Sequence, residues 1–202
     1  MHILTLLLGF VFGDLVFETT PLPTPVVRDA ILRLAPRYQV GPRLAKQYAR
    51  IVQQEARRRK VDPLLVVSFI QVETARKWNP RLKSPTNDFG LTQVHVAVNG
   101  SARFLGREEE LYDPRTNVRE WVRLAAMWRA YHQRECEVHA EICYSGPEGP
   151  WGCNKMRIAG SRHPWWAHLK WGYRVKNTEH AQKVTGVYRW LLQQFHHLPE
   201  SS

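Results

Sequence analysis

The chain has 202 residues, 44% of them hydrophobic, which is enough for one well-formed core with an appended subdomain. Its net charge is +11 and its pI is near 10.0, so it favours anionic partners such as nucleic acid, anionic lipid or the anionic polymers of a bacterial wall. The sequence has no zinc-finger spacing, no Gly-rich phosphate loop and no RNA-binding aromatic strand motif, so we expect no nucleic-acid partner.

Residues 1–20 contain an apolar run. The run has the length of the hydrophobic part of a signal peptide and is too short to span a bilayer. No Lys or Arg precedes it and no small-x-small cleavage site follows it. The pattern favours export slightly over a membrane anchor or a buried N-terminal element. The stretch from Thr20 to Pro25 alternates with proline and predicts a linker.

Helices are predicted along most of the remaining chain. The segment from Pro42 to Lys60 is the clearest, because its apolar residues recur on one face, and its basic end is expected to be a solvated C-terminus favoured by the helix dipole. Further helices are expected from Val26 to Ala35, after Asp113-Pro114 and after Thr178. Strand alternation is weak everywhere, with only short pieces expected near Leu91 to Val98. The sequence therefore predicts a mainly α fold.

The helix from Pro63 to Glu73 is apolar almost all round, so we expect it to be buried. Asp62 suits the N-cap and Pro63 suits the first helical position. At the far end, apolar surroundings and the negative end of the helix dipole both favour the neutral form of a carboxylic acid. A neutral acid is what a general acid needs, so Glu73 is the candidate catalytic residue. Alternatively, Glu73 is the first polar residue past the helix and faces water.

The three cysteines are Cys136, Cys143 and Cys153. In an exported protein this number predicts one disulfide and one free thiol, with the pairing left open. His132, Cys136, His139 and Cys143 share one helical face, but the outer two would lie about 16 Å apart along a straight helix and cannot converge on one tetrahedral ion. We therefore expect no metal and no cofactor.

A series of short motifs surrounds Glu73. Glu73-Thr74 is followed by Trp78-Asn79-Pro80, Ser84-Pro85 and Gly90-Leu91-Thr92-Gln93. This series resembles the Glu-Ser, aromatic-Asn-Pro, Ser-Pro and Gly-Leu-Met-Gln pattern of the soluble lytic transglycosylase, or SLT-type, family, whose fold is related to goose-type lysozyme. Two downstream stretches resemble further family motifs: Leu111-Tyr112-Asp113-Pro114 with Asn117-Val118, and Tyr144-Ser145-Gly146-Pro147.

The chain departs from the family pattern at three places. Two extra residues separate Glu73 from Trp78, and Thr92 replaces the usual Met. His180 stands where the family often has a Tyr that helps to hold the catalytic Glu and the substrate.

The resemblance implies a lysozyme-like α-helical domain with short irregular or β segments at the cleft. Residues 42–198 would form this domain, after an apolar segment at 1–20 and a linker with a short helix at 21–41. The resemblance also implies a lytic transglycosylase that cleaves the β-1,4 bond between N-acetylmuramic acid (MurNAc) and N-acetylglucosamine (GlcNAc) in peptidoglycan. Glu73 would serve first as acid and then as base, which leaves 1,6-anhydro-MurNAc ends without hydrolysis.

Four residues are expected to contact the substrate: Thr74, Gln93, Tyr144 and His180. The amide of Gln93 offers a donor and an acceptor for sugar groups, and Tyr144 combines a flat apolar body with a hydroxyl. Three of them have a structural alternative, because Thr74 can end its helix, Gln93 can be a polar residue at a helix start and Tyr144 can belong to the core. Gly146 to Gly160 is predicted to be a loop. The same choice between glycan stacking and core packing applies to Trp151, Trp165, Trp166 and Trp171.

Two alternative functions stay open. The first is a hydrolytic muramidase on the same fold, which would be possible if Asp88 faced the cleft and activated water, although a turn residue is the better interpretation of Asp88. A non-catalytic peptidoglycan-binding or assembly protein would explain His180 and the two-residue insertion. The expected partners are peptidoglycan strands, with the N-terminal segment allowing contact with a membrane or cell envelope, or with a secretion or phage assembly. The expected location is the bacterial envelope, the periplasm, the exterior or a virion.

Overall fold

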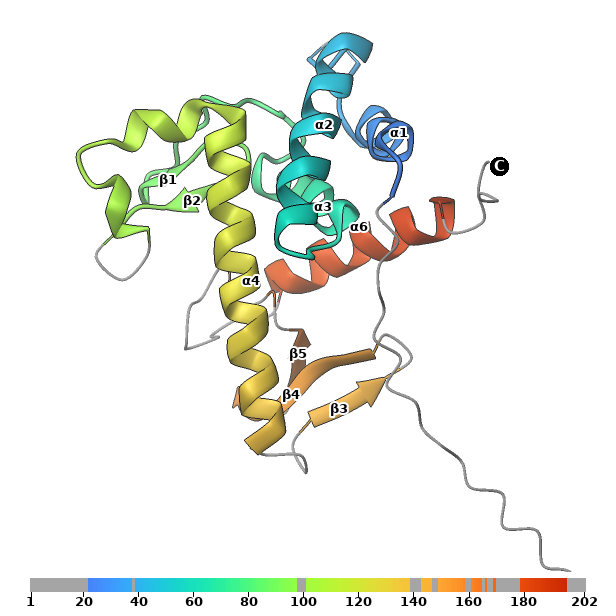
Figure 1. Ribbon diagram of the computed structural model, residues 1–202, viewed down its shortest axis with the longest axis vertical. Helices are drawn as coiled ribbons and strands as arrows, with labels where there is room; N and C mark the ends of the chain where they lie inside the picture. The colour runs from blue at the N-terminus through green and yellow to red at the C-terminus, as the bar shows by residue number, and fades with distance from the viewer. Residues whose placement is uncertain are drawn as a thin grey trace, which may run out of the picture.

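The computed structural model describes residues 22–37, 39–97, 101–138, 143–146, 149–158, 161–164, 166, 169 and 179–195, and it describes side chains for all of these except 132–138, 143–146, 149–158 and 161–164. Within these ranges the chain is mainly helical, which confirms the predicted fold class (Figure 1). The apolar segment 1–20 and the predicted cap Thr178 lie outside the described residues, and the predicted domain boundaries stay predictions. No helix in the described ranges has the length and apolar character needed to cross a membrane.

The first two helices pack against each other. They are α1 (Thr24–Leu34) and α2 (Pro42–Arg58), and both begin close to a proline, which has a favourable backbone angle for a first helical turn. After α2 the chain turns through Lys60, whose φ of 52° lies in the left-handed region that ends many helices. Arg129 donates to the backbone oxygens of Arg59 and Lys60, so a side chain from another helix satisfies carbonyls at this end.

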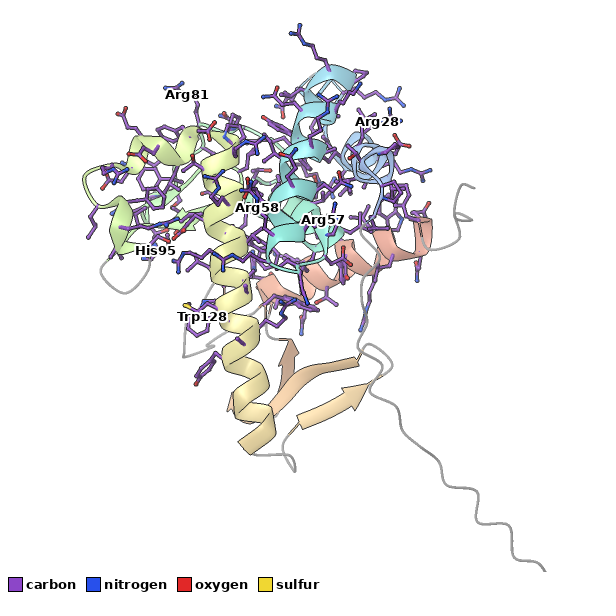
Figure 2. The ribbon with its side chains drawn as sticks, viewed as in Figure 1. Arg28, Arg57, Arg58, Arg81, His95 and Trp128 are labelled. Carbon is purple, nitrogen blue, oxygen red and sulfur yellow. The ribbon has the colours of Figure 1, made fainter. Side chains whose placement is uncertain are left out.

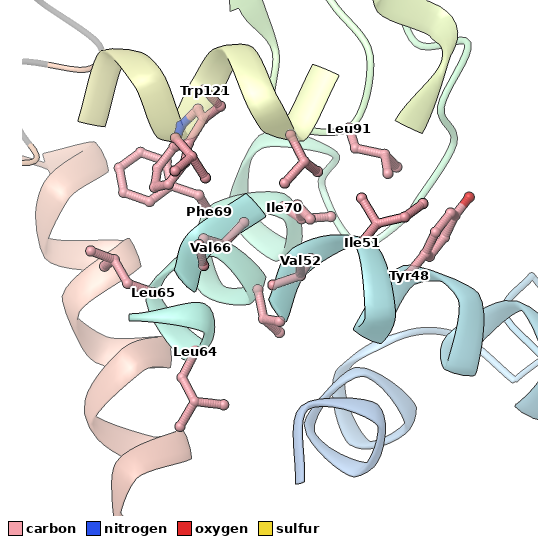
Figure 3. Close-up of a cluster of buried hydrophobic side chains, with 14 of the residues drawn as sticks. Tyr48, Ile51, Val52, Leu64, Leu65, Val66, Phe69, Ile70, Leu91 and Trp121 are labelled. Atoms are coloured by element: carbon pink, nitrogen blue, oxygen red, sulfur yellow. The ribbon is translucent and has the colours of Figure 1, made fainter. Parts of the chain in front are cut away.

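Helix α3 (Pro63–Glu73) forms the centre of the core, as its apolar sequence predicted. Every residue from Pro63 to Gln71 is buried, and Asp62 caps the helix by accepting a hydrogen bond from the Leu64 amide at 2.8 Å. Figure 3 shows Leu64 and Leu65 beside α6, and Phe69 against Trp121, with ring centroids 4.7 Å apart.

Two later helices enclose α3. Helix α4 (Pro114–Val138) begins at the predicted Asp113-Pro114 signal and is the long helix in front of the molecule in Figure 1, whereas α6 (Glu179–Phe195) runs beneath α3. Tyr188 on α6 donates its hydroxyl to Asp62 Oδ2 at 2.5 Å. The residue that caps the start of α3 therefore also ties it to α6.

A small hairpin and two 3-10 turns connect α3 to α4. Strands β1 (Asp88–Phe89) and β2 (Val94–His95) pair in an antiparallel register. Strand β2 lies within the region in which short strand pieces were expected, and β1 lies just before that region. The turns η1 (Ala102–Phe104) and η2 (Glu108–Tyr112) follow.

The prediction of a loop from Gly146 to Gly160 is wrong, because most of this stretch is a strand. Strand β4 (Gly149–Ile158) pairs on one side with β3 (Cys143–Gly146) and on the other with β5 (Ser161–Pro164). The residues Gly149, Pro150 and Gly152 have low strand propensity, so the sequence pattern indicated a loop. Hydrogen bonds to a neighbouring strand on each edge stabilise β4 in spite of its low strand propensity. Strand propensity depends more on tertiary context than helix propensity does.

Candidate active site

Glu73 is the last residue of α3 and its side chain is only 10% exposed. The alternative in which Glu73 faces open water therefore does not hold. Its Oε1 atom lies 2.8 Å from Nε2 of His180, which is on the first turn of α6. Residues that are far apart in sequence thus form a nearly buried acid–base pair at the end of the central helix.

His180 is held at the junction of three helices. Its side chain is 16% exposed, and its ring packs on Phe69 of α3 with centroids 5.7 Å apart. Phe69 in turn packs on Trp121 of α4. Within the described part of the chain neither ring nitrogen of His180 forms an aligned hydrogen bond, so its contact with Glu73 is a close approach of acid and base and not a fixed hydrogen bond.

Thr74 ends the helix that carries Glu73. The residue is fully buried, and its hydroxyl donates to the Ile70 carbonyl at 2.7 Å while it accepts from the Trp78 amide at 3.2 Å. Both bonds stabilise the chain as it leaves α3. They favour the structural role of Thr74, and its contact with substrate stays a prediction.

The two extra residues after Glu73 are accommodated in an exposed turn. Ala75 and Arg76 have φ angles of 46° and 69°, in the left-handed region that costs a non-glycine residue about 1 kcal/mol. Trp78 then returns to the core, where it is 2% exposed and donates its indole N–H to Gln71 Oε1 at 2.8 Å. The insertion therefore lies between two buried, hydrogen-bonded residues, Thr74 and Trp78.

Gln93 is partly buried and has a left-handed φ of 49°. Its amide nitrogen donates to the carbonyl oxygens of Gly90 at 2.7 Å and Leu82 at 3.2 Å. The amide thus ties two parts of its own loop together. A further contact of Gln93 with a sugar stays a prediction.

Asn117, in the first turn of α4, fixes the loop that carries Gln93. Its Oδ1 accepts from both the amide and the hydroxyl of Thr92 at 2.8 Å, and its Nδ2 donates to the Phe89 carbonyl at 2.7 Å. A Cβ on Gly90 would lie 2.3 Å from Asn117 Nδ2 at a φ of 76°, so only glycine fits there. Asn117 belongs to the motif that begins at Leu111, but no role was assigned to it from the sequence. Its position in the first turn after Asp113-Pro114 could have pointed to a structural role.

Asp88 organises the β1–β2 hairpin. Its Oδ2 accepts from the hydroxyls of Ser84 and Thr86 at 2.7 Å, and its Oδ1 lies 2.9 Å from Nδ1 of His95. Asp88 is 7% exposed. These contacts support the interpretation of Asp88 as a residue of the turn region.

The aromatic candidates fall into two groups. Trp166 is 2% exposed, donates to the Thr185 hydroxyl at 3.2 Å and packs edge-on against Tyr188, so it belongs to the core. Tyr144 is in β3, opposite Gly152, but its side chain lies outside the described residues, as do those of Trp151, Trp165 and Trp171. Among the described residues no group of three or more His, Cys, Asp or Glu is placed to hold a metal ion.

Part of the chain matches a known protein family. Residues 50–133 match the family model described as the transglycosylase SLT domain. The matched region contains Glu73, the β1–β2 hairpin and the larger part of α4, whereas α6 with His180 lies beyond it. No curated protein matches the chain.

Proposed function

We propose that the chain is a peptidoglycan lytic transglycosylase with Glu73 as its general acid and base, starting from the match of residues 50–133 to the transglycosylase SLT domain. The observation that carries the proposal is the nearly buried Glu73 carboxyl group at the end of an apolar helix, 2.8 Å from an imidazole nitrogen. A histidine does not carry the permanent positive charge of an arginine, so it leaves the neighbouring carboxyl group able to act as an acid.

The other buried glutamates are less suited to this task. Glu55 and Glu120 are 2% and 0% exposed, and both contact arginine side chains. An arginine stays charged throughout the physiological pH range, so it holds its partner as a carboxylate. Glu73 instead contacts a histidine, whose ring can be neutral or charged.

In the proposed reaction the Glu73 carboxylic acid donates its proton to the oxygen that bridges MurNAc and GlcNAc. The bond between that oxygen and the MurNAc anomeric carbon breaks, and the GlcNAc side leaves as an alcohol. The Glu73 carboxylate then removes the proton from the MurNAc 6-hydroxyl, whose oxygen bonds to the anomeric carbon. The product is a 1,6-anhydro ring, Glu73 is protonated again and no water is consumed.

His180 supports this cycle as a positioning residue. Its Nε2 lies 2.8 Å from Oε1 of Glu73. Its packing on Phe69 holds the ring in place, so the imidazole stays beside the carboxyl group.

The two alternative functions have less support. Ordinary glycosidases use two carboxylates that flank the bond. Asp88, the candidate second carboxylate, is engaged by Ser84, Thr86 and His95, which leaves it poorly placed to activate water. A purely binding protein would not need a nearly buried acid against an imidazole. The net charge of +11 also suits an anionic cell wall, and we place the protein at the bacterial envelope or outside the cell as part of the proposal.

Mass spectrometry of digested peptidoglycan tests the proposal directly. The wild type is expected to release anhydro-muropeptides, Glu73→Gln none, and the control variant Glu120→Gln the same products as the wild type. Reducing-end products from the wild type would instead identify a muramidase. An absence of products from the folded wild type would leave the binding or assembly role.

A further inference from the structure

A basic pocket lies between α2 and α4, separate from Glu73 and His180. It has a volume of about 150 Å³ and is lined by Glu55, Arg58, Arg59, Arg103, Arg119, Val122 and Arg123. The lining residues come from the end of α2, from η1 and from the first half of α4. Figure 2 places Arg58 where α2 passes α4.

Two buried carboxylates hold the arginines of this pocket in place. Glu55 lies 3.1 Å from Arg58 and 3.3 Å from both Arg115 and Arg119. Burial by itself raises the pKa of the Glu55 carboxyl, but the hydrogen bond and charge of Arg119 and the charges of Arg58 and Arg115 outweigh it, so the pKa is lowered. Glu55 is therefore a carboxylate at neutral pH.

Glu120 repeats the arrangement on α4. It is fully buried, contacts Arg103, lies 2.8 Å from Arg123 and accepts from the Ser101 hydroxyl at 2.7 Å. Burial again raises the pKa of this carboxyl, and Arg123 and Ser101 together with Arg103 lower it by more. The two glutamates thus fix four of the five lining arginines at defined positions.

The positive charge of the pocket exceeds what the glutamates neutralise. Six guanidinium groups surround the two carboxylates when Arg115 is included, and Asp113 acts on Arg119 as a third negative charge. Three positive charges therefore remain uncompensated. Arg59 has no acidic partner within the described part of the chain, and Arg58, Arg103 and Arg119 are each at least half exposed.

We infer that this pocket binds a phosphate group of an anionic envelope polymer. Guanidinium groups bind phosphate through paired N–H donors, and a cluster with several surplus charges suits a phosphate better than a single carboxylate. The lining has no aromatic side chain on which a base could stack, which argues against single-stranded nucleic acid. The role does not depend on Glu73: the pocket would hold the protein on its polymer while catalysis takes place elsewhere.

Arg59→Gln and Arg57→Gln form a matched pair that tests the pocket. Both residues are exposed at the end of α2 and both changes remove one positive charge, but only Arg59 lines the pocket. Neither change removes an arginine that contacts Glu55 or Glu120. Inorganic phosphate is titrated by calorimetry at constant ionic strength, with acetate as the carboxylate control. We expect Arg59→Gln to weaken phosphate binding by about tenfold and Arg57→Gln to change it by less than about twofold.

Three outcomes would overturn the inference: no phosphate binding, equal weakening by the two variants, or acetate bound as tightly as phosphate. A second titration with a poly(glycerol phosphate) chain identifies the source of the phosphate. The inference is supported if the wild type binds poly(glycerol phosphate) more tightly than inorganic phosphate and if Arg59→Gln loses this difference. Equal affinity for both would overturn the polymer and leave a site for free phosphate. Because these are binding measurements, they stand whether or not Glu73 proves to be catalytic.

Discussion

The Glu73 site and the basic pocket both bury glutamate side chains, but they give them different partners. Glu73 contacts the imidazole of His180 beside an apolar helix, whereas Glu55 and Glu120 contact permanently charged arginines. The carboxyl groups of the pocket are fixed as anions and organise positive charge around them. Under the proposed function, the contact of Glu73 with an imidazole leaves its carboxyl group able to give a proton to the substrate and take one back. Burial alone therefore does not make a glutamate catalytic; the chemistry of its partner decides what it can do.

The largest expected difference between the two regions is in turnover. Glu73→Gln keeps the size of the side chain but removes the proton to be donated, so we expect glycan cleavage to fall by about 1000-fold. Glu120→Gln, measured at a temperature where it is folded, should stay within about twofold of the wild-type rate. Release of labelled glycan fragments from purified peptidoglycan measures both. Similar losses in the two variants would contradict the separation of roles.

His180 is the next place at which to test the comparison. His180→Ala removes the contact with Glu73 Oε1, and we expect kcat to fall by about tenfold to a hundredfold with little change in KM, because a misplaced acid reacts slowly but the glycan still binds. His180→Tyr restores the residue type of the family pattern and should keep more activity. A fall in thermal stability with unchanged kcat in His180→Ala would show that the residue only packs against Phe69.

Stability at acid pH is expected to distinguish the pocket from the Glu73 site. The pKa of Glu120 is lowered from 4.5 in the folded protein, so its stabilising effect is fully present above about pH 4.5 and is lost as the pH falls through the folded-state pKa. Glu120→Gln should lower the free energy of unfolding by about 2 kcal/mol at pH 7. Below about pH 4.5 the free energy of unfolding should fall less steeply with pH in this variant than in the wild type. Urea titrations from pH 2 to pH 7 measure this, with exposed Glu109→Gln as the control, in which both effects should be absent.

The smallest expected effect on turnover concerns the cysteines. The register of β3 and β4 sets Cys143 opposite Cys153, and directly opposite residues of antiparallel strands have Cα atoms about 4.5–5.5 Å apart, within the range of a disulfide. We predict that Cys143 and Cys153 form a disulfide when oxidised glutathione takes up the two electrons, and that Cys136 stays a thiol. We expect kcat to be unchanged. Peptide mapping without reduction checks the pairing. A bridge to Cys136 would contradict the strand register.

Much of the helical framework could be predicted because its signals are local. Asp62 and Pro63 mark the start of α3, and the unbroken apolar run that follows requires burial. The position of Glu73 at the end of that run made it the candidate acid before any contact was known. Strand β4 could not be predicted in this way, since its Gly and Pro residues have low strand propensity and only its two neighbours make it a strand.

The arginine cluster around Glu55 and Glu120 could be predicted only in part from the sequence. Arg115, Arg119 and Arg123 are spaced four residues apart, so the sequence placed them on one face of α4. The basic end of α2 was expected to be merely solvated, because nothing local shows that another basic helix passes beside it. The packing of α2 on α4 brings the two groups of arginines together around Glu55, and that contact is not encoded in either segment alone.

The sequence by itself thus determined where α2, α3 and α4 begin, that α3 is the buried centre, and that a carboxyl group stands at its end, because capping, periodicity and apolar composition act over a few residues. Only the tertiary structure decided that His180 would be the partner of Glu73, that arginines would surround Glu55 and Glu120, and that β3, β4 and β5 would pair. These features join residues distant in the chain, and their energies depend on the packing of whole elements against one another.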